Sequence, residues 1–205
     1  RDVLDWLGPI VHEYYSASEG LGFCAIGPDE WLAHPGSVGR SLTGPVHIVG
    51  PDGDELPPGE DGVVWFEPPA RFEYHGDPQK TAEAFDHRGW GTLGDVGHLD
   101  DDGYLFIDGR AKDMIITGGT NVYPVEVEGV LLAHPDVADA GVFGVPDDDW
   151  GESIVAAVQL RPGVPADADT QARLAAFCRE RLASYKCPRV WEFRGDMPRT
   201  DAGKL

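Results

Sequence analysis

The sequence pattern changes at residues 108–112, and this change limits the possible folds more than any other feature of the chain. Before it, short apolar runs alternate with turns rich in Asp, Gly and Pro, and each run has the length of a β-strand. Examples are VHIVG (46–50), GVVWFE (62–67) and GYLFIDG (103–109). After it, segments with helical periodicity alternate with β-branched runs. The sequence therefore predicts two units of different architecture.

We expect an α+β chain whose first unit, residues 1–109, is β-rich and resembles a small barrel or sandwich. The second unit, residues 110–205, should be a small mixed α/β domain. Its predicted helices cover 123–135 and 167–188, and its predicted strands cover 137–147, 152–160 and 190–198. The apolar side chains of the longer helix share one face: Leu174, Phe177, Cys178 and Leu182.

Composition excludes several classes of protein. The formal net charge of −20 argues against a protein that binds nucleic acids or membrane surfaces. The three cysteines are widely spaced and form no CxxC pair, which argues against a disulfide framework or a cysteine zinc site and favours the cytoplasm. The seven histidines show no paired spacing, so metal binding by histidine is not expected. No apolar run reaches the length of a membrane span.

The segment EYYSASEG (13–20) carries groups that suit a nucleotide triphosphate with Mg²⁺. Tyr14 and Tyr15 offer aromatic faces, the serines offer hydroxyls, and Glu19 offers a carboxylate for the metal. The alternative is an ordinary edge strand that ends in a polar turn. Taken alone, the segment favours that alternative.

Asp95 lies in GWGTLGDVG (89–97), which reads as a tight glycine turn. A carboxylate in such a place can accept two hydrogen bonds from a vicinal diol such as a ribose. In isolation, however, an aspartate that satisfies its own turn is the commoner case.

The segment GRAKDMIITGG (109–119) combines two basic side chains with a glycine pair. Arg110 supplies a rigid donor fork and Lys112 a mobile charge, while Gly118 and Gly119 would let a ligand approach the backbone. A charged, solvated hairpin is the alternative. Near the other end, Lys204 follows a glycine in a polar stretch and by itself is a surface lysine.

Taken together and in order, four motifs resemble the carboxy-terminal part of the adenylate-forming (acyl-CoA synthetase, AMP-binding) superfamily. The family pattern Y-G-x-T-E resembles residues 15–19, where Ser16 and Ser18 replace glycine and threonine. The pattern G-W-x-x-T-G-D resembles residues 89–95, with Leu93 in place of threonine. The third motif, G-R-x-K-D-x-I followed by G-G-x-N-x-x-P, matches 109–124, and the fourth, P-x-T-x-x-G-K, matches 198–204.

The resemblance implies a role for each matched residue. Tyr15 would stack on adenine, Ser18 would touch a phosphate and Glu19 would hold Mg²⁺. Asp95 would bind the ribose hydroxyls with help from Arg110. The remaining roles concern the second unit: Lys112 as a hinge, Gly118 and Gly119 along the pantetheine path, and Lys204 between carboxylate and α-phosphate. Lys204 and Lys112 are thus the expected catalytic lysines.

The resemblance also implies a reaction. An ATP-dependent ligase would convert a carboxylic acid, expected to be a fatty or related acid, into an acyl-adenylate and then into a thioester of coenzyme A. We expect the chain to be a fragment, namely the end of a large AMP-binding domain (1–109) and a nearly complete mobile domain (110–205), and to be inactive alone. Its partners would be the acid, ATP, CoA and the missing amino-terminal part. A peptide-synthetase adenylation domain and a non-catalytic α/β binding module remain the alternatives.

Overall fold

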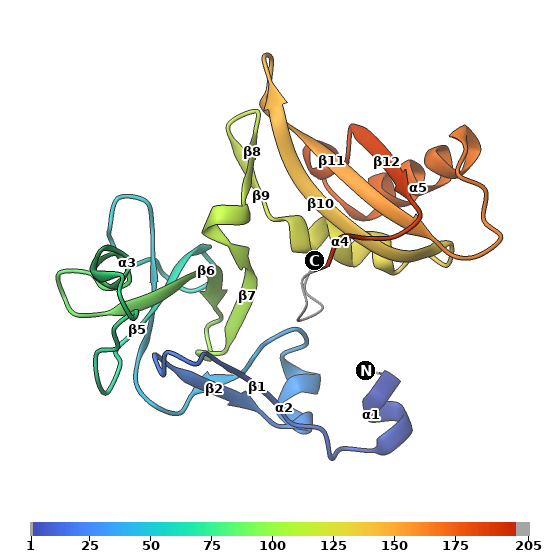
Figure 1. The fold of residues 1–205 in the computed structure, drawn as a ribbon. Coiled ribbons are helices and arrows are strands. Elements are labelled where there is room, and N and C mark those ends of the chain that lie inside the picture. Colours follow the sequence, from blue (N-terminus) through green and yellow to red (C-terminus); the bar gives the residue numbers. More distant parts are fainter. Residues whose placement is uncertain (1, 200–205) are drawn as a thin grey trace. The chain divides into compact units, whose positions relative to one another are not determined.

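The computed structural model describes residues 2–199, and they form two compact units. The first unit runs to Ala111 and the second begins at Lys112. Each unit has its own cluster of buried apolar side chains, and the two clusters share no residue. The chain therefore consists of two separately packed bodies along the sequence (Figure 1).

The first unit contains two antiparallel sheets and three short helices (Figure 1). The smaller sheet has the order β1 (Glu13–Ser16), β2 (Phe23–Ile26), β3 (Arg40–Ser41). The larger has the order β4 (Val46–Val49), β5 (Gly62–Phe66), β6 (Gly91–Leu99), β7 (Leu105–Arg110). The helices are α1 (Asp2–Leu7), α2 (Pro28–Ala33) and α3 (Pro78–Glu83). In the described residues both sheets are open, so the expected barrel is not confirmed.

One apolar core joins the two sheets of the first unit. Cys24 of the smaller sheet and Ile48, Val64 and Phe66 of the larger one are almost fully buried in the same cluster. Gly22 is required at this junction, because a Cβ there would lie 2.2 Å from the Phe66 ring. The core therefore packs the smaller sheet, which contains β1, against the larger sheet, which contains β6.

The expectation of a glycine turn at residues 89–97 was wrong, because Gly91–Leu99 is strand β6. Gly91 and Gly97 in this strand reflect close packing rather than chain reversal. A Cβ at Gly97 would lie 2.0 Å from the Phe106 carbonyl oxygen, and one at Gly91 would lie 2.2 Å from the Leu21 side chain. Asp95 is consequently a strand residue with only 6% of its surface exposed.

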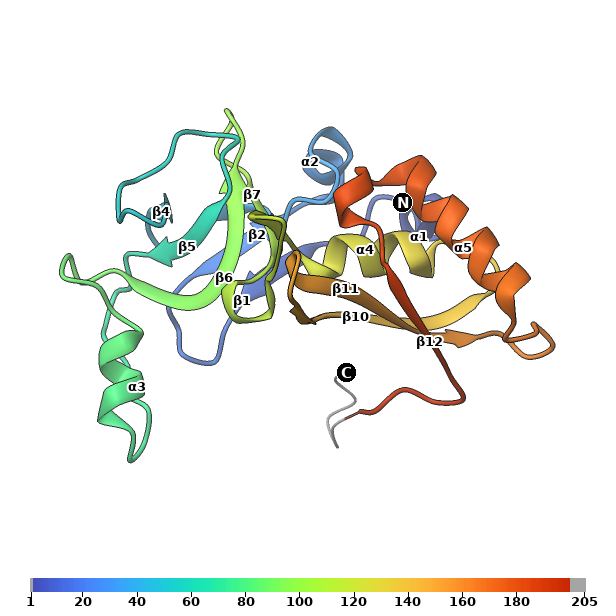
Figure 2. The same ribbon diagram turned by 90° about the horizontal axis from the view of Figure 1, so that it is seen from above.

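The second unit is a five-stranded sheet covered by two helices. After the 3₁₀ turn η1 (Ala111–Asp113), the sheet consists of β8 (Ile115–Thr117), β9 (Thr120–Val122), β10 (Val137–Asp147), β11 (Gly151–Leu160) and β12 (Val190–Arg194). Strand β12 runs parallel to β11, and the other pairs are antiparallel. Helices α4 (Pro124–Leu132) and α5 (Ala168–Arg181) cover one face, and the 3₁₀ turn η2 (Ser184–Lys186) leads to β12 (Figure 2).

The core of the second unit confirms the predicted amphipathic helix in part: the helix ends at Arg181, because Leu182 is already extended, and Phe177 is only partly buried. Leu174, Cys178 and Leu182 are buried in one cluster with Val127 and Leu131 of α4. Asp167 caps α5, because its carboxylate accepts a hydrogen bond of 2.9 Å from the Thr170 amide. Among the helices described, none is both long and apolar enough to cross a membrane. The fold is thus mixed α and β with open sheets.

Candidate functional site

An irregularity in strand β6 places Asp95. Between β5 and β6, Val63 pairs with Val96 and Trp65 with Thr92, so three residues of β6 lie opposite the single residue Val64. Gly94 lies within this bulge at φ +77°, a conformation that a residue with a side chain rarely adopts. Bulges of this kind re-aim side chains and are frequent beside functional sites.

The Asp95 carboxylate is held from two sides. Arg110, its partner across the β6–β7 ladder, donates from Nε to Oδ1 at 3.0 Å. The hydroxyl of Tyr15, from strand β1 of the other sheet, donates to Oδ2. Asp95 is buried, whereas the side chain of Arg110 is 51% exposed. The carboxylate is therefore fixed in orientation, and each oxygen keeps a second lone pair for a ligand donor.

Tyr15 is wedged between the core and this carboxylate. Its ring lies against Phe66 with centroids 6.2 Å apart, and burial followed by the hydrogen bond to Asp95 raises the pKa of its hydroxyl above the usual range. Tyr14, on the opposite side of the strand, is 70% exposed and stacks on Phe23. The hydroxyl of Tyr15 therefore remains protonated and acts as a donor.

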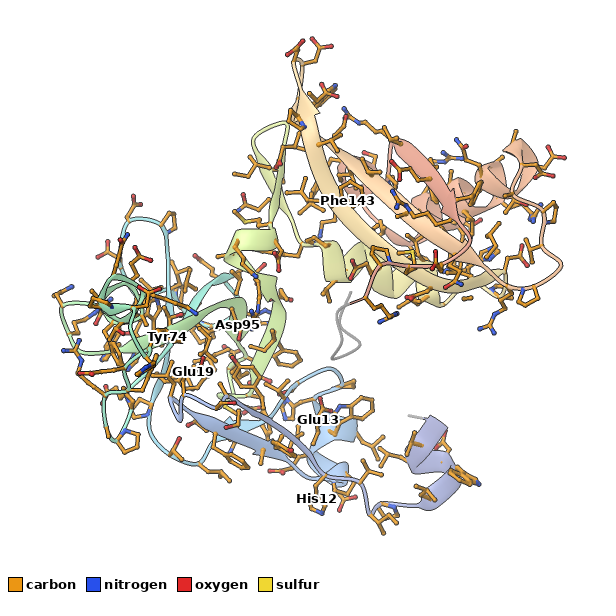
Figure 3. The ribbon with its side chains drawn as sticks, viewed as in Figure 1. His12, Glu13, Glu19, Tyr74, Asp95 and Phe143 are labelled. Atoms are coloured by element: carbon orange, nitrogen blue, oxygen red, sulfur yellow. The ribbon has the colours of Figure 1, made fainter. Side chains whose placement is uncertain are left out.

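Glu19 and Tyr74 form a second contact in the same unit (Figure 3). The Tyr74 hydroxyl donates to Glu19 Oε1 at 3.1 Å. Burial and this hydrogen bond raise the pKa of Tyr74, while the positive charge of Arg110 acts in the opposite direction. The electrostatic influence of Arg110 therefore extends to both contacts, Tyr15–Asp95 and Tyr74–Glu19. Ser18 is exposed beside them.

Sequence reasoning did not find Tyr74. Its amide donates to the Thr81 hydroxyl at 2.9 Å, so helix α3 positions it. Lys80 of that helix places Nζ 3.9 Å from the centroid of the Tyr74 ring. The only signal in the sequence is an aromatic residue ahead of a helix capped by Asp77 and started by Pro78. Such a signal indicates a helix start and no ligand.

The arrangement suits the binding of a ligand that carries a diol, phosphates and Mg²⁺. Mg²⁺ is commonly held by one or two carboxylates together with substrate phosphates, and Glu19 is a partly exposed carboxylate of this kind. Asp95 offers oriented acceptors for a diol, and Arg110 offers a guanidinium for anionic oxygens. Residues of strand β1, the segment before α3, and strands β6 and β7 are thus brought together on one unit.

The glycine pair of the second unit forms the turn of the β8–β9 hairpin. Gly118 and Gly119 have φ of +58° and +75°, as a two-residue turn of type I′ requires. The Gly118 amide donates to the Trp150 carbonyl at 2.8 Å, and a Cβ at Gly118 would lie 3.1 Å from the Trp150 ring. The ring of Trp150 also lies under Arg189, whose Cζ is 3.8 Å from its centroid.

The structure describes only one of the two expected catalytic lysines. Lys112 is exposed within η1 and is the first residue of the second unit. Lys204 lies outside the described residues. The structure therefore brings Tyr15, Asp95 and Arg110 together directly and Glu19 to Tyr74, whereas Lys112, Gly118 and Gly119 belong to the second unit.

Comparisons with known proteins show which family model and which relatives match this chain. The family model described as "AMP-binding enzyme C-terminal domain" matches residues 126–204. A 2-succinylbenzoate–CoA ligase of Geobacillus kaustophilus is 41% identical over 198 residues, which are 96% of this chain and 40% of that protein. A fatty acid–[acyl-carrier-protein] ligase of Streptomyces coeruleorubidus is 46% identical over 160 residues, covering 77% of this chain and 30% of that protein.

A solved structure agrees with these relatives. The o-succinylbenzoate CoA synthetase of Bacillus subtilis, in complex with its acyl-adenylate intermediate, superposes with a TM-score of 0.88 at 33% identity. The match covers 100% of this chain and 41% of that one. The same enzyme is also known in complex with ATP and a magnesium ion.

Fold, motifs and relatives together define a class of protein, the adenylate-forming enzymes, and the relatives named above are ligases of coenzyme A or of an acyl carrier protein. The chain belongs to the adenylate-forming superfamily and corresponds to the carboxy-terminal portion of its acyl-CoA ligases. It spans about 40% of the length of the first of the curated relatives.

Proposed function

We propose that this chain supplies the carboxy-terminal part of an ATP-dependent carboxylic acid–CoA ligase. The observation that carries the proposal is the convergence of Tyr15 and Arg110 on the buried carboxylate of Asp95. Three of the four ordered motifs meet in this contact or beside it, which a solvated turn or a plain edge strand would not require.

The proposed roles follow from the geometry of each side chain. Asp95, held by two protein donors, would accept hydrogen bonds from the ribose hydroxyls with its remaining lone pairs. Arg110 would keep that carboxylate oriented. Tyr15 would offer its ring to adenine while its hydroxyl stays on Asp95.

Glu19 would bind Mg²⁺, and Tyr74 would orient its carboxylate through Oε1. The metal would neutralise charge on the phosphates of ATP. Ser18 would donate its hydroxyl to a phosphate oxygen, which its exposed position permits.

Two half-reactions would then use the second unit in turn. Attack of the substrate carboxylate on the α-phosphate releases pyrophosphate and develops negative charge, which Lys204 would stabilise. A thiol then attacks the acyl carbon and AMP leaves, with Gly118 and Gly119 beside the path of the pantetheine. A pivot at Lys112 would let one small domain serve both steps.

The identity of the carboxylic acid is a separate part of the proposal. The family resemblance favours a fatty or related acid, and one relative is named for fatty acids. Another is named for 2-succinylbenzoate, and a third, in Cupriavidus necator, for sulfoacetate. Coenzyme A is the proposed thiol, and an acyl carrier protein is the second candidate because of the Streptomyces relative.

The test is ATP–pyrophosphate exchange by a full-length enzyme that contains this chain, across fatty acids of different length, 2-succinylbenzoate and sulfoacetate. We expect exchange with at least one acid, and thioester formation only after a thiol is added. Absence of exchange with every acid, together with no ATP binding, would favour the binding-module alternative. The 205-residue chain assayed alone should form no acyl-CoA.

Lys204→Ala in that enzyme should block adenylation while sparing thioester formation from supplied acyl-adenylate. Loss of one positioned charge stabiliser typically slows a step by about a hundred- to a thousandfold. Separate assays of the two half-reactions measure the effect, with Lys186→Ala, whose side chain pairs with Glu126 in the second unit, as a lysine control. Equal slowing of both half-reactions would contradict a role confined to the first step.

A further inference from the structure

Three histidines of the first unit each contact two carboxylates, but the contacts are of two kinds. His34 and His47 use both ring nitrogens. The pairs are His34 Nδ1–Asp100 at 2.7 Å, His34 Nε2–Asp102 at 3.9 Å, His47 Nδ1–Glu55 at 2.7 Å and His47 Nε2–Glu67 at 3.1 Å. A protonated imidazole carries one N–H on each nitrogen, so each of these two rings can satisfy its partners without any further group.

His98 differs because both of its carboxylates lie at the same nitrogen. Nδ1 is 3.0 Å from Asp61 Oδ1 and 3.2 Å from Asp108 Oδ2. The single hydrogen on Nδ1 must be shared between the two oxygens. Within the described part of the chain, these three side chains form a group whose donor atoms all lie within 4.8 Å of one another.

The backbone positions of the three residues bring their side chains together. Asp61 directly precedes β5, while His98 and Asp108 lie on β6 and β7. In the β6–β7 ladder Val96 pairs with Gly109 and Gly97 with Ile107, so Asp108 is a bulged residue without a partner in the register. Bulges turn side chains away from the regular alternation of a strand. The ring of His98 is fixed by stacking on Phe106, with centroids 4.9 Å apart and planes 4° apart.

We propose that Asp61, His98 and Asp108 form a binding site for one divalent transition-metal ion of the zinc type, with water as the fourth ligand. One imidazole nitrogen and two carboxylate oxygens are a donor set that zinc accepts. The three side chains are 27% to 48% exposed, so an ion and its water can enter from solvent.

The spacing of the donor atoms fits such an ion. In a tetrahedral site with metal–ligand bonds of about 2.0–2.1 Å, neighbouring donor atoms lie about 3.3 Å apart. The two Nδ1–oxygen distances of 3.0 and 3.2 Å need only a small opening to reach that value. A cation between the donors would replace the shared hydrogen as the group that holds them together.

The electrostatics of the group support a cation. Two carboxylates converge on a single imidazole nitrogen, so at most one positive charge faces two negative charges. A divalent ion would offset both carboxylates, and its binding would release protons from the site. The net charge of −20 also favours cations near this surface.

The experiment is calorimetric titration of the reduced 205-residue chain with ZnCl₂, in buffer with excess Mg²⁺ to occupy weak carboxylate sites. We expect one equivalent to bind. Asp61→Asn, His98→Asn and Asp108→Asn should each weaken binding by at least about tenfold, since even loss of an outer-shell partner typically costs that much. Co²⁺ should give the intense visible bands of a four-coordinate site in the wild-type chain only.

The matched control is His47→Asn, because His47 also contacts two carboxylates but on opposite nitrogens. It should bind zinc like the wild-type chain. A thermal melt of each variant without zinc separates lost folding from lost binding, and Asp61→Asn, which changes an exposed residue ahead of β5, is the variant expected to fold normally. Unchanged zinc affinity in both Asp61→Asn and His98→Asn, or equal loss in His47→Asn, would overturn the proposal.

Discussion

At the scale of single residues, the carboxylate of Asp95 links the proposed nucleotide site to the stability of the first unit. The sequence suggested an exposed aspartate in a turn, whereas the side chain is buried in β6 between two donors. The residue proposed to bind the ribose thus also accepts the hydrogen bond of the partly buried Tyr15 hydroxyl.

Asp95→Ala should lower the free energy of unfolding of the chain, because it leaves the Tyr15 hydroxyl without its acceptor. An unsatisfied buried polar group costs about 1–3 kcal/mol. Urea denaturation of Asp95→Ala, Tyr15→Phe and the double variant measures the coupling. We expect the double variant to be no less stable than Asp95→Ala alone. Strictly additive losses would show that the two side chains do not interact.

At the scale of elements, the second unit was predictable and parts of the first were not. Strands β10 and β12 and helices α4 and α5 follow from apolar periodicity, because each buries one face against a single core. Strand β6 was missed because its glycines are dictated by neighbours distant in sequence, such as Phe106 behind Gly97. Tyr74 and the group around His98 were missed because their partners come from different strands and loops.

The β8–β9 hairpin offers a prediction with an internal control. Gly119 has φ +75° and open space where a Cβ would lie, so only backbone strain opposes a side chain there. Gly119→Ala should destabilise the hairpin by about 1–2 kcal/mol, the cost of a left-handed conformation. Gly119→Asn should cost less, since asparagine tolerates this region.

Hydrogen exchange at the β8–β9 amides of the chain measures this local effect, and thioester formation by the full-length enzyme measures the proposed role. If Gly119→Asn keeps the hairpin intact yet slows thioester formation, the glycine serves the thiol path. If activity simply follows hairpin stability across both variants, the glycine pair has no role beyond the turn.

Helix α4 is attached to strand β10 through a carboxylate that is costly to ionise. Glu128 Oε1 accepts a hydrogen bond of 2.8 Å from the Val142 amide, and burial raises the pKa of this glutamate. A raised pKa in the folded state contributes stability below the unfolded pKa, and this contribution is lost as the pH rises through the folded value.

Glu128→Gln keeps an acceptor for Val142 without the charge. We expect it to be more stable than the wild-type chain at neutral pH and equally stable at a pH well below the ordinary glutamate pKa of about 4.3, where Glu128 is protonated in both states. Urea midpoints across this pH range measure the difference, with Asp148→Asn, at an exposed carboxylate between β10 and β11, as control. A stability gain that does not change with pH would contradict the titration of Glu128 as its cause.

At the scale of the whole molecule, the two units are separate bodies with separate cores, divided between Ala111 and Lys112. The first unit carries the proposed contacts to the nucleotide and Mg²⁺. The second carries the glycine hairpin, and Lys204 belongs to its part of the sequence. This division of residues suits a reaction in which one body holds the adenylate while the other presents different groups in successive steps.

The hinge proposal can be tested by fixing the backbone at the division. Lys112 lies within the short 3₁₀ turn η1, and proline there would fix its φ, remove its amide hydrogen and push Ala111 out of the helical region. Lys112→Pro in the full-length enzyme should therefore leave one half-reaction nearly intact and disable the other, because the trapped orientation suits one step only. Asp113→Ala, in the same turn, is the control for a general loss of local structure. Pyrophosphate exchange and thioester formation from supplied acyl-adenylate measure the two steps separately, and a variant that performs both at the wild-type rate would refute a pivot at Lys112.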